Sequence, residues 1–155
     1  MNLIKSMQDT TPAEIASEPV RFDTKIAIVA REDLPVWQKL NVTAFLMSGI
    51  AAQHPDIMGE PYVDADGRHY NRMCAQPIIC MSASAEKLLV IHQRAIARDI
   101  VTSAYTEEMF ATGHDAANRA VFGQFGKTNA RIVGLALRAP KKVVDKITDG
   151  ARMHS

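Results

Sequence analysis

The feature that most constrains the fold of this chain is a short apolar run, Ile26 to Ala30, which lies between Lys25 and Arg31. Consecutive apolar residues rich in β-branched side chains are typical of a strand that is buried on both faces. Such a strand needs helices above and below the sheet to which it belongs. The run therefore predicts an α/β fold.

The rest of the chain alternates helix and strand patterns. Apolar residues at helical spacing predict helices at about 35–52, 84–98 and 140–150, with a short helix at 115–122. Short apolar runs predict further buried strands at 77–81, 100–105 and 131–137. A hairpin is expected within 59–70, where Asp64-Ala65-Asp66-Gly67 has the composition of a turn. Together these segments predict an α/β domain of three layers, with a mixed central sheet of about four strands and helices on both faces.

The length of 155 residues and the 47 % hydrophobic content indicate one domain with one core. Residues 1–23 contain Pro12 and Pro19 among small polar side chains and are expected to form a flexible N-terminal arm, with the domain at 24–155. The sequence has no uncharged apolar run of about 18 residues and no apolar signal region near Met1. We therefore expect a cytoplasmic protein that does not bind a membrane.

Two cysteines, Cys74 and Cys80, are separated by five residues, which matches neither a redox pair nor a disulfide framework. We expect reduced, buried thiols. The formal net charge is only +1, but residues 111–155 hold 8 Lys and Arg against 3 Asp and Glu. A basic patch of this kind could contact phosphates, although solvated helix faces of the same charge are commoner.

Several apparent motifs have simpler explanations. Gly126-Lys127-Thr128 imitates the end of a phosphate-binding loop, but Val121 stands where that loop needs its first glycine. His114 before an alanine-rich stretch is more typical of a helix cap than of a catalytic pair with Asp115.

Four side chains could be imagined as metal ligands, namely His54, Asp64, Asp66 and His69. Their spacing matches no known metal site, and an Asp-x-Asp-Gly turn forms without metal because aspartate caps turns and glycine accepts a positive φ. We expect neither a metal nor another cofactor.

Charged residues follow two of the predicted strands. Arg31-Glu32-Asp33 ends the first strand and runs into a helix that carries Lys39 and Asn41, and Thr106-Glu107-Glu108 ends the strand at 100–105. Open α/β sheets commonly bind ligands at the carboxyl ends of their strands. These two segments are therefore either a binding crevice or solvated loops.

The same segments resemble the peptidyl-tRNA hydrolase II family. The stretch from Lys25 to Leu34 is similar to that family's first strand and its Arg-x-Asp-Leu turn, and Gln76-Pro77 is similar to the start of its next strand. The segments 100–107 and 133–150 are similar to its acidic strand and loop and to its closing strand and helix. The whole pattern, hairpin included, is closer still to an uncharacterised group of domains of unknown function allied to that superfamily.

The resemblance implies a site at the strand ends. It implies Lys39 as the cation that stabilises an oxyanion and Glu107, in place of the family's aspartate, as the base in ester hydrolysis. The implied binding residues around them are Arg31, Asp33, Asn41, Glu108 and Thr112. The helix start differs from the family, because it lacks that family's glycines and leaves either Lys39 or Asn41 at the position of its lysine.

Two classes of function follow. One is a noncatalytic homodimeric domain that binds a small ligand or a protein in this crevice, because the missing glycines would keep a polymeric substrate from the backbone. The alternative is a hydrolase of a peptidyl-tRNA-type ester, with Lys39 and Glu107 and with the basic C-terminal third on the tRNA phosphates. An unrelated enzyme is a third alternative. The dimer is expected because the helix at 35–52 carries more apolar surface than one sheet face covers.

Overall fold

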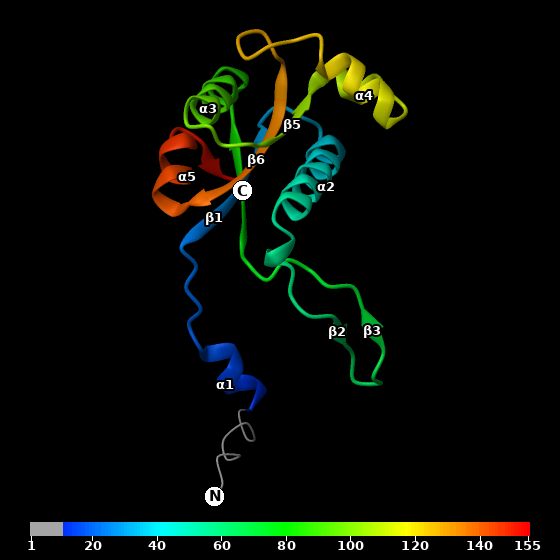
Figure 1. Cartoon of the computed structure of the whole chain (residues 1–155), viewed down its shortest axis with the longest axis vertical. Helices are drawn as coiled ribbons and strands as arrows, with labels where there is room; N and C mark the ends of the chain where they lie inside the picture. Colours follow the sequence, from blue (N-terminus) through cyan, green and yellow to red (C-terminus); the bar gives the residue numbers. More distant parts are fainter. Residues whose placement is uncertain (1–10) are drawn as a thin grey trace, which may run out of the picture.

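A five-stranded mixed sheet forms the centre of the molecule in the computed structural model, which describes residues 11–155 (Figure 1). In spatial order the strands are β5 (Ser103–Thr106), β6 (Ile132–Pro140), β1 (Thr24–Arg31), β4 (Ile78–Ala83) and β7 (Arg152–Met153). β1 pairs in parallel with β4, whereas every other neighbouring pair is antiparallel. The predicted α/β fold with a mixed sheet is confirmed, and β7 is a fifth strand that the prediction missed.

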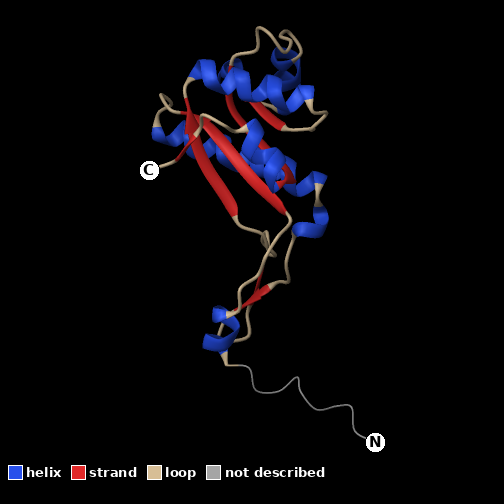
Figure 2. Ribbon diagram, turned by 90° about the vertical axis from the view of Figure 1, so that its left-hand side faces the viewer, coloured by secondary structure: helices blue, strands red, loops and turns tan. Residues whose placement is uncertain are grey.

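Helices cover both faces of this sheet (Figures 1 and 2). α2 (Val36–Gln53) packs on one face, and α3 (Ala85–Ala97) and α5 (Lys141–Ile147) pack on the other. Successive side chains of a strand point to opposite faces. Ile26 and Ile28 of β1 therefore join the core under α2, while Ala27 and Val29 join the core under α3 and α5.

The contact between α2 and β6 depends on a glycine. A Cβ atom at Gly134 of β6 would lie 2.4 Å from Val42 Cγ1 and 2.9 Å from Leu46 Cδ1. Both neighbours belong to the fully buried face of α2. The absence of a side chain at this position lets the helix lie directly on the sheet.

The helix ends follow the sequence signals closely. Ser84 caps α3 by accepting a hydrogen bond from the Lys87 backbone N–H at 3.1 Å. His114 caps α4 (Asp115–Phe122) through Nδ1, which accepts from the Ala117 backbone N–H at 3.2 Å, as predicted. α5 ends three residues before Gly150, whose φ of +94° turns the chain towards β7.

The predicted hairpin is present as a separate two-stranded ribbon, β2 (Tyr62–Val63) and β3 (His69–Tyr70). It projects from the body of the molecule in both views (Figures 1 and 2). A short helix, η1 (Pro55–Ile57), connects α2 to it. Within the predicted N-terminal arm the structure contains α1 (Pro12–Ser17), and the part of that arm before residue 11 lies outside the described residues.

Two expectations about β4 are wrong. Ile78 is 38 % exposed and Cys80 is exposed, so this strand is not buried on both faces. Both cysteines are free, as predicted, but Cys80 is exposed and Cys74 is only partly buried. The physical reason is that α2 lies over β1 and β6 and leaves the same face of β4 open. Within residues 11–155, no helix combines the length and apolarity needed to cross a bilayer.

Candidate functional site

The carboxyl ends of β1 and β5 meet at one rim of the sheet. Both strands pair antiparallel with β6, so they run in the same direction. β1 ends at Arg31, and β5 is followed directly by the short helix η2 (Glu107–Ala111). Arg31 Nε lies 2.5 Å from Asp33 Oδ1, and Arg31 Nη1 lies 3.3 Å from Glu107 Oε2. The rim therefore carries one cation between two carboxylates.

The Arg31 guanidinium is held in its charged form. Its side chain is only 16 % exposed. Burial opposes the charge, but the hydrogen bonds and the attraction of Asp33 and Glu107 outweigh it, so the pKa of Arg31 is raised. Because both carboxylates are already bound to it, this cation is neutralised in place.

A second ion pair fixes η2 to the start of β6. Arg131 Nε lies 2.7 Å from Glu108 Oε1. Burial favours the neutral acid, but the Glu108 backbone N–H and Arg131 favour the carboxylate more strongly, so the pKa of Glu108 is lowered. The pair holds the segment between β5 and α4 against the sheet.

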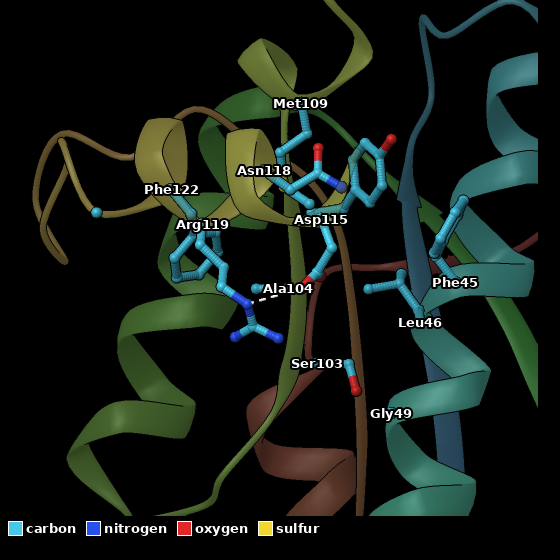
Figure 3. A pocket seen from close by; sticks show the side chains of 12 residues that line it. Phe45, Leu46, Gly49, Ser103, Ala104, Met109, Asp115, Asn118, Arg119 and Phe122 are labelled. Carbon is cyan, nitrogen blue, oxygen red and sulfur yellow. Dashed lines mark hydrogen bonds and ion pairs between the residues drawn. The ribbon is translucent and has the colours of Figure 1, made fainter. Parts of the chain in front are cut away.

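A cavity lies next to this segment, between α2, β5 and α4 (Figure 3). It has a volume of about 660 Å³. A smaller cavity of about 310 Å³ shares Phe45, Tyr105, Met109, Asp115 and Asn118 with it. Because they share these lining residues, the two cavities adjoin, and we call them together the α2–α4 groove.

Aromatic rings line much of this groove. The ring centroids of Phe45 and Tyr105 lie 5.9 Å apart, those of Tyr105 and Phe110 lie 5.1 Å apart, and those of Trp37 and Phe110 lie 6.1 Å apart. Separations of this size are typical of favourable edge-to-face and tilted ring contacts. Burial raises the pKa of the Tyr105 hydroxyl, which keeps this ring neutral.

Polar groups of the groove come mainly from α4. Arg119 Nε lies 2.8 Å from Asp115 Oδ2, and both side chains are exposed at the mouth of the groove (Figure 3). Thr112 donates its hydroxyl hydrogen bond to Asn118 Oδ1. On the opposite wall a Cβ atom at Gly49 would collide with the Ser103 hydroxyl, so the glycine brings β5 close to α2.

A family model described as "Protein of unknown function (DUF2000)" matches residues 24–155. The chain belongs to the DUF2000 family. This DUF2000 chain is also similar to a solved structure of a protein of unknown function, Atu0240, from Agrobacterium tumefaciens strain C58. The two share 61 % identity with a TM-score of 0.86, over 87 % of this chain and all of the other. No curated protein matches the sequence.

The residues that the sequence predicted for a site fall into separate places in this DUF2000 domain. Arg31, Asp33 and Glu107 meet at the rim, and Glu108 pairs with Arg131. Asn41 and Thr112 line the α2–α4 groove. Lys39 points elsewhere, because its Nζ lies 3.2 Å from Nε2 of His154, beyond β7. The predicted pair, Lys39 and Glu107, therefore engages different partners.

Sequence reasoning missed most of the groove. Trp37, Phe45, Tyr105, Phe110 and Phe122 line it, and they are five of the nine aromatic residues of the chain. The small number of aromatic residues elsewhere in the chain could have drawn attention to these five. Their spacing in the sequence, however, does not indicate that they meet in one groove. Among residues 11–155, no group of three or more histidine, cysteine or acidic side chains is arranged to hold a metal.

Proposed function

We propose that this DUF2000 domain binds a small organic ligand with a flat aromatic body and a polar end in the α2–α4 groove. The observation that carries the proposal is the cavity of about 660 Å³ with an aromatic wall and polar groups at its mouth. Small-molecule sites usually have volumes of about 300–1,000 Å³, mostly apolar linings and a few polar groups that orient the ligand. The groove has all three properties.

The chemistry of the lining suggests how such a ligand would lie. The rings of Phe45, Tyr105 and Phe110 offer edges and faces to a planar group. Asn41 and Asn118 carry amides that can donate and accept hydrogen bonds at one end of the groove. Asp115 and Arg119 offer one charge of each sign at the mouth. A ligand with an aromatic body and a carboxylate or amine fits this distribution.

The single tryptophan provides a direct test. Trp37 lines the smaller part of the groove and contacts Phe110, so a bound aromatic molecule should alter its fluorescence. We would titrate the protein with aromatic carboxylates, aromatic amines and uncharged heterocycles. Binding should be lost in Asn118→Ala and kept in Asn129→Ala, which removes an amide outside the groove. If no compound changes the fluorescence at about 1 mM, the proposal is wrong.

A second candidate is hydrolysis of a peptidyl-tRNA-type ester, as the resemblance of the strand ends implies. It is favoured by one observation, the exposed Glu107 carboxylate with a cation at 3.3 Å. A carboxylate can act as a base towards water. Two features oppose it: Arg31 is already bound by two carboxylates, and Lys39 is directed to His154.

The basic C-terminal third gives tRNA binding little support. Arg119, Arg131 and Arg152 each form an ion pair with a carboxylate of the same domain, which leaves less charge for phosphates. The test is release of a blocked aminoacyl group from tRNA by the wild type, Glu107→Gln and Lys39→Ala. Release that depends on both side chains would establish hydrolysis, whereas release unchanged by both substitutions would place the reaction elsewhere.

A further inference from the structure

One flank of α2 borders an uncovered part of the sheet. In the parallel pair of β1 and β4, Ile26 stands opposite Ile78 and Ile28 opposite Cys80. Side chains opposite one another point to the same face, and the two β1 residues are buried under α2. The two β4 residues on this face are exposed instead. The helix therefore stops short of β4.

The helix itself presents apolar residues to this uncovered strip. Phe45 and Gly49 face β5, as their contacts with Tyr105 and Ser103 show. Val36 precedes Phe45 by nine residues and Leu40 precedes Gly49 by nine, which is about two and a half helical turns, so Val36 and Leu40 lie on the opposite flank of the helix, towards β4. Their exposed fractions are 72 % and 67 %. These are apolar side chains without cover in the described structure.

The extension of β7 completes the strip. The His154 backbone N–H donates to the Cys80 carbonyl, and the His154 ring contacts Lys39. Arg152 stands opposite Ser82 of β4 and pairs with Glu32. We call this surface the open face, and it consists of Val36, Lys39, Leu40, Ile78, Cys80, Arg152 and His154.

The hairpin, residues 59–73, is the second uncovered feature. Apart from Gly59 and Asp64, every residue in it is exposed. Its exposed apolar side chains are Tyr62, Val63, Tyr70 and Met73. An isolated two-stranded hairpin is at best marginally stable in water. No other segment of the described chain buries the apolar side chains of this hairpin.

The turn of the hairpin is nevertheless well defined. The Asp64 carboxylate accepts hydrogen bonds from the backbone N–H groups of Asp66 and Arg68 and from the Tyr70 hydroxyl, at 2.9 to 3.0 Å. These bonds, led by the one from Arg68, lower the pKa of Asp64. Gly67 adopts a φ of +80° that other residues rarely adopt. The hairpin is thus shaped before it meets any partner.

The two uncovered features have opposite charge. Between residues 59 and 73 the hairpin holds the three acids Glu60, Asp64 and Asp66 against the two arginines Arg68 and Arg72. The open face holds Lys39, which contacts His154, and Arg152, which is paired with Glu32, so Lys39 is the cation left in excess among these residues. Complementary charge of this kind favours one register of contact between two surfaces.

We propose that two copies of this chain exchange hairpins, each hairpin lying across the open face of its partner. A second copy is the occupant because the same chain carries both the apolar, acidic hairpin and the apolar, basic face. A dimer with two-fold symmetry would cover both hairpins and both open faces at once. The proposal is independent of the ligand, because the α2–α4 groove lies on the other flank of α2.

The dimensions agree with such an exchange. At about 3.3 Å per residue, the hairpin from Gly59 to Ala65 extends roughly 20 Å, which exceeds the length of β4. The hairpin and the open face together offer about 22 residues on each protomer, within the roughly 20–30 residues per side of a stable interface.

The exposed Cys80 permits a direct test by cross-linking. In Ala65→Cys the hairpin turn carries a thiol, and a short bismaleimide should join it to Cys80 of the other copy. We expect a covalent dimer on a denaturing gel, and we expect the Ala65→Cys, Cys80→Ser double variant to lose it. A cross-link within one chain would mean that the hairpin folds onto its own face, and the exchange would be refuted.

Sedimentation provides an independent measurement. The full-length wild type should sediment as two 17.0 kDa chains at micromolar concentration. Val63→Asp in the hairpin and Leu40→Asp on the open face should each halve that mass without changing the circular dichroism spectrum, because both positions are exposed. Val101→Asp is the control, since Val101 is 71 % exposed before β5, at the opposite edge of the sheet. A monomeric wild type, or a dimer that survives both substitutions, overturns the proposal.

Discussion

The two flanks of α2 belong to one helix but have opposite surroundings. On the β5 flank, η2 and α4 rise beside the helix and enclose the α2–α4 groove. On the β4 flank, the described chain supplies no such wall, and Val36 and Leu40 are exposed. The difference arises from the connections. The chain leaving β5 stays on the α2 side, whereas the chain leaving β4 forms α3 on the opposite face.

This comparison shows how one topology creates two kinds of binding surface. A single helix over five strands cannot cover both edges of a sheet face. Where a later segment of the chain fills the gap, the result is a concave site suited to a small molecule. Where none does, the result is a flat apolar strip that suits another macromolecule.

We expect the largest loss of stability from a substitution that disrupts the contact between α2 and β6, because the position of both flanks of the helix depends on it. In Gly134→Ala the new methyl group would press on Val42 and Leu46 and lift α2 from β6. We expect a loss of about 2–3 kcal/mol in the free energy of unfolding, as is usual for overpacked cores. Gly113→Ala is the control, since a Cβ there meets nothing within 4 Å. Urea denaturation measures both, and equal stability of the two variants would refute the described packing.

The next prediction compares one alanine substitution on each flank of α2. Phe45→Ala removes the ring that contacts Tyr105, and we expect it to lower the free energy of unfolding by about 1 kcal/mol at every protein concentration. Leu40→Ala on the other flank should cost less than about 0.5 kcal/mol in the monomer, because the side chain is exposed. If the exchange of hairpins occurs, the Leu40→Ala loss grows with protein concentration. A concentration-dependent loss in Phe45→Ala instead would reverse the assignment of the two flanks.

The third effect depends on pH and concerns the groove flank alone. Glu108 has a lowered pKa in the folded protein, so its contribution to stability is present above its ordinary value of 4.5 and is lost as the pH falls through the lower, folded value. Glu108→Gln should therefore reduce stability by up to about 1 kcal/mol at neutral pH and flatten the acid limb of the stability curve. Glu60→Gln, in the exposed hairpin, is the control and should change the free energy of unfolding at neutral pH by less than about 0.5 kcal/mol. Urea titrations at several pH values would detect the difference.

The sequence predicted most of the fold because its signals are local. The apolar run of β1 and the His114 cap each act within a few residues. It missed β7, because two residues carry no periodicity. The sequence also predicted that β4 is buried, because the identity of an apolar residue does not show whether a distant helix covers it.

The candidate site was only partly predictable for the same reason. Arg31 ends β1 and Glu107 directly follows β5, and the antiparallel pairing of both strands with β6 brings them together. The groove joins Phe45 on α2, Tyr105 on β5 and Asn118 on α4, which lie far apart in the sequence. No local pattern records such a convergence.

The smallest expected effect on stability concerns the mouth of the groove. The ion pair of Arg119 and Asp115 is exposed, so Arg119→Gln should change the free energy of unfolding by less than about 0.5 kcal/mol. It should change ligand preference instead, because Asp115 then stands alone. We expect aromatic carboxylates to bind about two- to fivefold more weakly and aromatic amines more tightly by a similar factor, which Trp37 fluorescence would measure. Arg68→Gln, which removes a cation from the hairpin, is the matched control and should alter neither affinity. If Arg119→Gln shifts carboxylates and amines in the same direction, then the charges at the mouth do not orient the ligand, and recognition in the groove rests on the aromatic wall alone.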